Sequence, residues 1–164
     1  MTSSLSEDEL SKLQEAIENE SILIAKDVIA DLYKGFEKVM MFAGGLLYNV
    51  AKKAGKSMVK NVIERGLITP EHALEALIYT IEKSGYADRM EIVERNEKKI
   101  VIRAWGTLLG AKLSEERRKK PVDAPVVGFI AGWLEEAWGR KVDGKEVKCL
   151  AKGDPYCEFE LKLK

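Results

Sequence analysis

The stretch VKCLAKGDPYCEFELKLK, residues 147–164, decides the fold of this chain. From Cys157 onward, apolar and charged side chains alternate without a break, which predicts a half-buried β-strand. Val147 to Ala151 alternate in the same way, and Gly153-Asp154-Pro155 predicts the turn between the two strands. One face of this hairpin is apolar and the other is charged, so we expect an antiparallel sheet with one wet side.

Upstream of the hairpin, the sequence predicts four helices, two strands and one more helix. A capping box of Ser6 and Glu9 opens the first helix. By their periodicity and end signals, the other helices are expected at about residues 26–42, 47–66, 70–85 and 125–138. Strands around residues 90–92 and 100–105 flank a polar turn. This order predicts an α+β fold in which helices cover one face of a four-stranded antiparallel sheet.

The composition predicts one globular domain without a charge bias. The 164 residues are 46% hydrophobic and 33% charged, and 27 basic side chains balance 27 acidic ones. This balance gives no sign of direct nucleic-acid binding. The N-terminus has no signal-peptide pattern, and the longest apolar stretch, residues 39–51, is too short to span a bilayer. We expect a cytoplasmic protein, and few Gln and Asn beside many Lys and Glu suggest a thermophile.

The two cysteines allow three interpretations. Cys149 and Cys157 each lie on an apolar strand face, so the hairpin brings the two sulfurs near each other. They could be small core residues, a disulfide or metal ligands. Glu146 lies three residues before Cys149. In a regular strand this spacing places the two side chains on opposite faces, so Glu146 could join Cys149 only if a bulge interrupts the strand.

No catalytic constellation is visible in the sequence. His72 is the single histidine, so a Ser-His or Cys-His pair has only one possible member. No Gly-rich phosphate loop follows a predicted strand. We therefore expect a protein that is not an enzyme, with His72 in a surface or core position.

Residues 121–161 resemble the C-terminal half of the 4-vinyl-reductase domain family. The features at the family's spacing are Gly128, Gly132, Gly139-Arg140, Glu146, Cys149, Gly153 and Cys157. Residues 25–66 are similar more loosely, through Gly44-Gly45. The family includes the effector-binding domain of phenol-sensing transcription activators, and its fold is related to that of the TRAPP subunits that tether transport vesicles.

The resemblance implies a structural zinc site. Glu146, Cys149 and Cys157 match three ligands of the phenol sensors, whose fourth ligand is a Cys before the glycine-containing helix. Asp123 stands at that position here. Two carboxylates with two thiolates are a less common structural set than thiolates with imidazoles. We nevertheless expect Asp123 to complete the site.

The resemblance also implies a module that binds or senses a small molecule. We expect an apolar cavity between the helices and the sheet, holding an apolar or aromatic ligand. Gly128 and Gly132 would leave room for that ligand, or would let their helix pack closely on the sheet. The aromatic side chains expected near the cavity are Trp105, Phe129, Trp133, Trp138 and Tyr79. The alternatives are a scaffold module like the vesicle-tethering relatives and an accessory reductase protein.

A homodimer is also expected, because the relatives pair through their N-terminal helices. Residues 1–24 would form a dimerisation arm in front of a ligand-binding domain at residues 25–164. The apolar side chains Leu10, Leu13 and Ile17 need cover, and the first helix is expected to lie too far from the core to be covered by its own chain.

Overall fold

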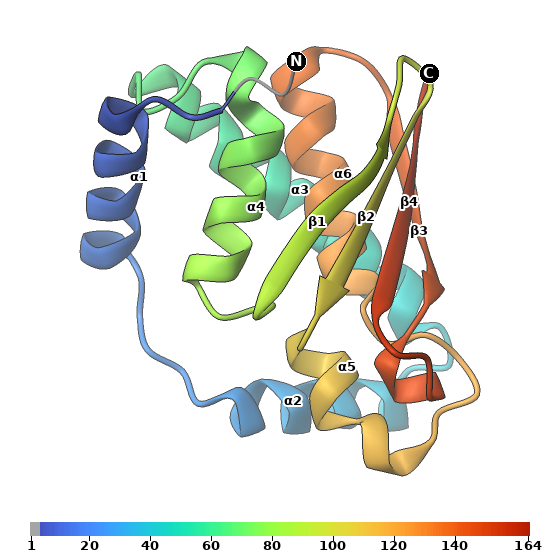
Figure 1. Ribbon diagram of the computed structural model, residues 1–164. Coiled ribbons are helices and arrows are strands. Elements are labelled where there is room, and N and C mark those ends of the chain that lie inside the picture. Colours follow the sequence, from blue (N-terminus) through green and yellow to red (C-terminus); the bar gives the residue numbers. More distant parts are fainter. Residues whose placement is uncertain (1–3) are drawn as a thin grey trace.

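The C-terminal hairpin forms half of a four-stranded antiparallel sheet in the computed structural model, which describes residues 4–164. The strands are β1 (Arg89–Arg95), β2 (Lys99–Trp105), β3 (Val142–Lys148) and β4 (Cys157–Leu163). Their order is β1-β2-β4-β3, so β4 lies inside the sheet and pairs with both β2 and β3 (Figure 1). The predicted α+β class is confirmed.

Helices lie on one side of this sheet (Figure 1). They are α1 (Glu7–Glu20), α2 (Lys26–Val39), α3 (Ala43–Glu64), α4 (Ala73–Lys83), α5 (Leu108–Lys112) and α6 (Ala124–Trp138), with short 3-10 turns at η1 (Pro70–His72), η2 (Ser114–Glu116) and η3 (Leu150–Lys152). Helix α6 packs on β3, and α3 packs on α6. Within residues 4–164, no helix is long and apolar enough to cross a membrane.

Glycines make the contact between α3 and α6 unusually close. A Cβ at Gly128 or Gly132 of α6 would overlap the backbone of Tyr48 or Lys52 in α3. On the α3 side, a Cβ at Gly55 would overlap the Phe129 carbonyl group. The glycine face of α6 therefore packs on another helix. The two expectations for it, room for a ligand and packing on the sheet, are both wrong.

Several element boundaries differ from the sequence prediction. Helix α3 begins at Ala43, so Gly44-Gly45 lies in its first turn and does not interrupt the helix. Strand β3 ends at Lys148, so Cys149 falls at the start of the turn that η3 forms. Helix α5 and η2 lie between the strand predicted at residues 100–105 and the helix predicted at residues 125–138, where the sequence predicted no helix.

Helix α1 is covered by its own chain. The capping box of Ser6 and Glu9 is present, and Leu13 is 1% exposed where α1 packs on α4. Ile17 is partly buried against the same core. The expectation that α1 lies too far away to be covered is therefore wrong. Residues 1–3 of the expected arm fall outside the described residues.

Helix α2 leaves most of its large apolar side chains exposed. Its apolar side chains include Val28, Leu32 and Val39, which are 50%, 55% and 80% exposed. Only Ala30 and Tyr33 of this helix are buried. Helix α2 thus packs mainly on α5 at one end of the molecule (Figure 1), with apolar side chains that face both the interior and the solvent.

Candidate functional site

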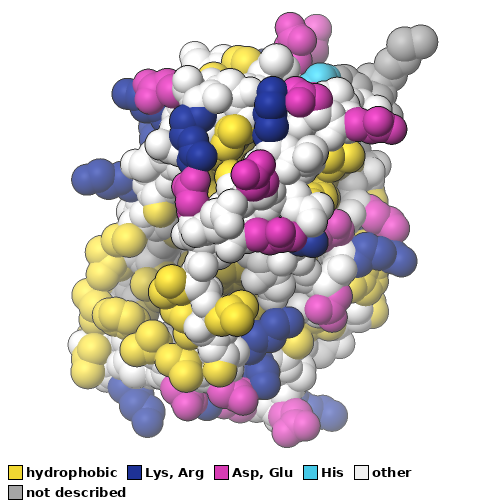
Figure 2. All heavy atoms as spheres, turned by 90° about the vertical axis from the view of Figure 1, so that its left-hand side faces the viewer, with side chains coloured by type: hydrophobic (Ala, Val, Ile, Leu, Met, Phe, Trp, Pro, Cys, Tyr) yellow, Lys and Arg dark blue, Asp and Glu magenta, His cyan; other side chains and the backbone are white. Residues whose placement is uncertain are grey.

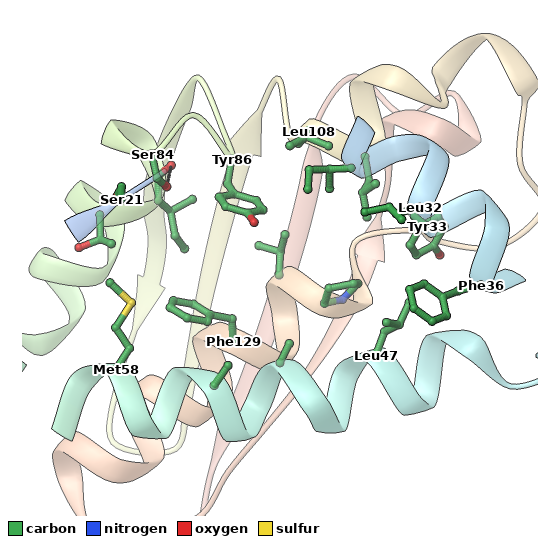
Figure 3. Close-up of a pocket in the computed structure, with 18 of the residues that line it drawn as sticks. Ser21, Leu32, Tyr33, Phe36, Leu47, Met58, Ser84, Tyr86, Leu108 and Phe129 are labelled. Atoms are coloured by element: carbon green, nitrogen blue, oxygen red, sulfur yellow. Dashed lines mark hydrogen bonds between the residues drawn. The ribbon is translucent and has the colours of Figure 1, made fainter. Parts of the chain in front are cut away.

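A cavity of about 530 Å³ lies among the helices (Figure 3). Helix α2 contributes Ile29, Leu32, Tyr33 and Phe36, α3 contributes Leu47, Ala51, Ala54 and Met58, and α1, α4, α5 and α6 provide further side chains. Among the described residues, no strand residue lines it. The cavity therefore lies between helices, and its expected place between the helices and the sheet is wrong.

The cavity extends along helix α3. Its floor is the α3 face formed by Leu47, Ala51, Ala54 and Met58, which recur at helical spacing. At a rise of 1.5 Å per residue this face is roughly 16 Å long. Figure 3 shows Met58 near one end, Leu47 near the other and Phe129 between them.

Few polar groups face the cavity, and none of its lining side chains within residues 4–164 is charged. Ser21 and Ser84 lie at the Met58 end in Figure 3. The Ser84 hydroxyl donates to the Ile81 carbonyl at 3.1 Å. Burial raises the pKa of Tyr33, and a neighbouring glutamate raises it further, so its phenol stays neutral. The lining therefore suits an apolar molecule with at most a small neutral polar end.

Of the aromatic side chains expected at the cavity, Phe129 lines it. Trp133 is fully buried elsewhere and donates Nε1–H to the Ala73 carbonyl at 2.8 Å. Trp105 packs against Tyr156, with its ring centroid 5.7 Å away, and beneath the Arg89 guanidinium.

The side chains of Trp138 and Tyr79 also lie outside the cavity, where each donates a hydrogen bond. Trp138 Nε1–H donates to the Pro70 carbonyl at 2.9 Å, and the Tyr79 hydroxyl donates to Gln14 at 3.3 Å. The prediction that these four aromatic side chains line the cavity is therefore wrong. The sequence of α2 held a signal for the residues that line the cavity. This helix has more apolar positions than a single buried stripe needs.

A second group of side chains lies at the other side of α5. Asp123, Glu146, Cys149 and Cys157 each offer one ligand atom, and these atoms all lie within 4.8 Å of one another. A register shift between Glu146 and Lys148 interrupts the β3–β4 ladder. This is the irregularity that the sequence required for Glu146 to reach the side of Cys149.

Hydrogen bonds hold this four-residue cluster in place. Asp123 Oδ2 accepts from Thr107 Oγ1 at 2.7 Å and from Cys157 Sγ at 3.1 Å. The Asp123 backbone N–H donates to Glu146 Oε2 at 2.8 Å. The remaining oxygens, Asp123 Oδ1 and Glu146 Oε1, are buried and have no hydrogen-bond partner among the described residues.

Burial dominates the electrostatics of the cluster. It raises the pKa of Asp123, and burial together with the nearby Asp123 charge raises the pKa of Glu146 to about 10. A hydrogen bond with Cys157 lowers the pKa of Cys149 to about 6. Both cysteines are free thiols. Two carboxyl groups and two thiols, with two buried oxygens that have no hydrogen-bond partner among the described residues, form a donor set that a cation fits, because a cation offsets the charge of the ionised groups and fills the open lone pairs.

Residues 112–163 match the model of the 4-vinyl-reductase domain, which confirms the resemblance to that family over this stretch. Two uncharacterized proteins of Methanocaldococcus jannaschii are similar in sequence. MJ0150 is 27% identical over 124 residues, covering 72% of this chain and 64% of that protein. MJ1460 is 27% identical over 158 residues, covering 90% and 88%. The aligned region thus spans just under two thirds of the length of MJ0150.

Three solved structures share the fold. The phenol-responsive sensory domain of the transcription activator PoxR, solved with phenol, has a TM-score of 0.78 at 15% identity, covering 97% of this chain and 92% of that one. A trafficking protein particle complex subunit 3 from Naegleria fowleri, covalently bound to palmitic acid, has 0.61 at 16%, covering 85% and 95%. A vinyl-4-reductase family protein from M. jannaschii has 0.57 at 22%, covering 99% of both. At these identities the likeness establishes the fold.

Proposed function

We propose that this chain is a small-molecule binding module that takes up an elongated apolar ligand in the cavity between α2 and α3. The observation that carries the proposal is the cavity itself, about 530 Å³ of space with an almost wholly apolar lining. The PoxR domain was solved with phenol and the trafficking subunit with palmitic acid, so relatives of this fold hold both a ring and a chain. The extended floor along α3, from Leu47 to Met58, favours the chain.

Binding in this cavity is non-covalent. The trafficking subunit holds its palmitic acid covalently. Here Cys149 and Cys157 lie in the buried cluster, and among the described lining residues there is no thiol to form such a bond. A non-covalent ligand exchanges with its surroundings, as a sensing module requires.

Filling the cavity is the direct test of this site. Ala51 lies on the α3 floor, so Ala51→Phe places a ring across the cavity. Titration with dansyl-labelled undecanoic acid should give saturable fluorescence at one probe per chain. In Ala51→Phe the affinity should fall about tenfold or more, because roughly one to two kcal/mol of apolar contact is lost.

Ser57→Phe is the matched control, since Ser57 is exposed on the same helix and does not line the cavity. It should bind the probe like the parent. Equal affinity in Ala51→Phe and the parent would place the binding site elsewhere.

We also infer that Asp123, Glu146, Cys149 and Cys157 hold one zinc ion with a structural role. The support is the pair of orphaned buried oxygens beside two thiols, a donor set of suitable type and number. Zinc there would join the β3–β4 hairpin to the start of α6, two segments separated in sequence. Four protein ligands leave no open position for a substrate.

Metal content and stability test the zinc proposal. Untagged protein from zinc-supplemented growth should hold about one zinc per chain, and Cys149→Ser or Cys157→Ser should lose it. Losing several kcal/mol of metal-linked stability should lower the melting temperature by on the order of 10 °C.

Asp143→Asn serves as the control for Asp123→Asn, because Asp143 forms surface ion pairs away from the cluster. It should retain the metal. If the parent protein holds well below one zinc ion per chain, the zinc proposal is wrong and the cysteines are core residues. If Asp123→Asn still holds one zinc ion per chain, Asp123 is not a ligand.

A further inference from the structure

Helix α2 and the loops at its two ends carry a broad apolar surface. Figure 2 shows hydrophobic side chains gathered in one lower region of the face that carries α1 and α2. The apolar face, as we call it, consists of Ile22, Leu23, Ile24, Val28, Leu32, Phe36, Val39, Met40, Met41, Phe42, Leu46 and Val50, which are 37% to 105% exposed. Side chains of this size and exposure present on the order of 1,000 Å², whereas the largest apolar patch on a typical monomer is about 300–600 Å². An apolar surface of this area indicates a docking site.

The apolar face has the form of a surface helix with an apolar anchor at each end. Val28, Leu32 and Val39 recur at helical spacing on α2 and line a shallow outer groove. The most exposed side chains flank the helix, with Leu23 in the linker before it and Met41 in the turn after it. A helix that lies in a bilayer surface buries its apolar side about 5–10 Å deep, at the boundary between headgroups and acyl chains. Helix α2 and its two anchors match this arrangement.

The apolar face also meets the cavity. Leu32 and Phe36 line both the inner cavity and the outer groove. These two side chains are therefore the place at which the apolar lining continues onto the outer surface.

Ion pairs within the chain neutralise the acidic side chains of α2. These pairs are Asp27 with Lys112 at 2.6 Å, Asp31 with Lys34 at 3.2 Å and Glu37 with Arg118 at 2.7 Å. The last pair also holds the loop after η2 alongside α2. The charge that this region offers to a partner therefore comes from its unpaired side chains.

The unpaired charge next to the apolar face is mainly basic. Four exposed cations of α2 and the loop after η2 form no ion pair among the described residues, namely Lys38, Arg117, Lys119 and Lys120. Over α2 and residues 112–120, the described ion pairs leave out one acidic side chain, Glu115. A second copy of the chain would bring the same basic excess against it, whereas anionic lipid headgroups attract it.

We propose that the apolar face docks on the surface of a bilayer that contains anionic lipid. Leu23 and Met41 insert at the two ends of α2, and the basic loop after η2 lies against the headgroups. The cavity then opens toward the bilayer at Leu32 and Phe36, so an apolar ligand enters it without crossing water. This last step rests on the proposed function, whereas the docking does not.

Sedimentation of the ligand-free full chain with vesicles tests the docking. Vesicles of phosphatidylcholine and phosphatidylglycerol in equal parts should bind the chain saturably. Met41→Glu should weaken this binding about tenfold or more, because a large inserted apolar side chain is lost. Val93→Glu makes the same change at an exposed position of β1 outside the apolar face, and it should bind like the parent.

Charge removal tests the role of the basic loop. Lys119→Gln/Lys120→Gln should weaken binding to these vesicles roughly thirtyfold, since each basic side chain near an anionic surface contributes about a fivefold gain. Lys98→Gln/Lys162→Gln is the matched control. These lysines are exposed in the β1–β2 turn and in β4, and that turn lies at the end of the molecule opposite α2 (Figure 1). This control should bind like the parent, and equal losses in both double variants would overturn the assigned role of the loop.

Titration with dansyl-labelled undecanoic acid in the absence of vesicles separates the docking from the cavity. Met41 does not line the cavity, so Met41→Glu should bind the probe like the parent but should take it up from preloaded vesicles about tenfold more slowly. Equal uptake rates would overturn the transfer step. A parent that does not bind anionic vesicles, or a Met41→Glu variant that binds them equally well, would overturn the docking whatever the probe titration gives. A parent of twice the chain mass that Met41→Glu reduces to one chain would assign the apolar face to a second copy and would also overturn it.

Discussion

At the scale of single residues, Glu9 fixes the first helix to the rest of the molecule. Its carboxylate accepts hydrogen bonds from the Ser6 and Thr69 backbone N–H groups at 3.0 and 3.2 Å, and it lies 2.8 Å from His72 Nδ1. Burial pushes the pKa of Glu9 upward, but these bonds outweigh it and lower the pKa from 4.5 to about 2. The single histidine is therefore a tether of α1, consistent with a structural role.

Glu9→Gln should lower the free energy of unfolding at pH 7 by about 1–3 kcal/mol, because it weakens a buried charge-assisted network. The pKa of Glu9 is lower in the folded than in the unfolded chain, so its stabilisation is complete above pH 4.5 and is lost as the pH falls toward 2. The difference between Glu9→Gln and the parent should shrink over that range. Urea unfolding at several pH values measures it.

Glu15→Gln is the control, because Glu15 is exposed on the same helix. It should change stability little at any pH. If Glu9→Gln has the same stability and the same pH dependence as Glu15→Gln, Glu9 does not fix α1 to the rest of the molecule.

The sequence identified the cluster residues better than the cavity residues, and the reason is physical. Cys149 and Cys157 stand out by type and spacing, and the resemblance added Asp123 and Glu146. Cavity residues such as Phe36 have no distinctive chemistry. An apolar side chain in a cavity wall follows the same helical period as one in the core, so periodicity does not separate the two.

At the scale of secondary-structure elements, the glycines between α3 and α6 determine how close the two helices lie. Gly132→Ala should destabilise the fold by about 1–3 kcal/mol, since its Cβ would overlap the Lys52 backbone and would force the helices apart. The denaturation midpoint measures this loss.

Gly45→Ala is the matched helical control. A Cβ at Gly45 meets no described atom within 4 Å, and alanine favours the helix by up to about 1 kcal/mol. This variant should equal or exceed the parent in stability. Similar effects of both substitutions would contradict the close packing of α3 on α6.

The long helices and the strands were predictable because each has one buried face and a clear period. Helix α4 is an example, because its apolar residues Leu74, Leu77 and Ile81 recur at helical spacing and are buried. Helix α5 was missed because five residues are too few to show a period. Helix α2 has two apolar faces, and its sequence does not show which face is buried. Only the tertiary structure shows that one faces the cavity and the other the solvent.

At the scale of the whole molecule, α5 separates the two candidate sites. Leu108 and Leu109 line the cavity. On the other side, a Cβ at Gly110 would lie 3.1 Å from Asp123 Oδ2. The cluster thus lies behind the part of the cavity wall that α5 forms, and α2, which packs on α5, forms the neighbouring part of that wall. The cavity is the feature that these elements share.

The proposed ligand of this cavity is an elongated apolar molecule. Calorimetric titration of the full chain with straight-chain alcohols from hexanol to dodecanol, with phenol as a compact reference, tests it most directly. Each added CH₂ that enters the cavity should contribute about 0.8 kcal/mol, so Kd should fall about fourfold per carbon until the chain fills the cavity, and the long alcohols should bind far more tightly than phenol. A Kd that does not change with chain length, or phenol binding at least as tightly as dodecanol, would contradict the claim.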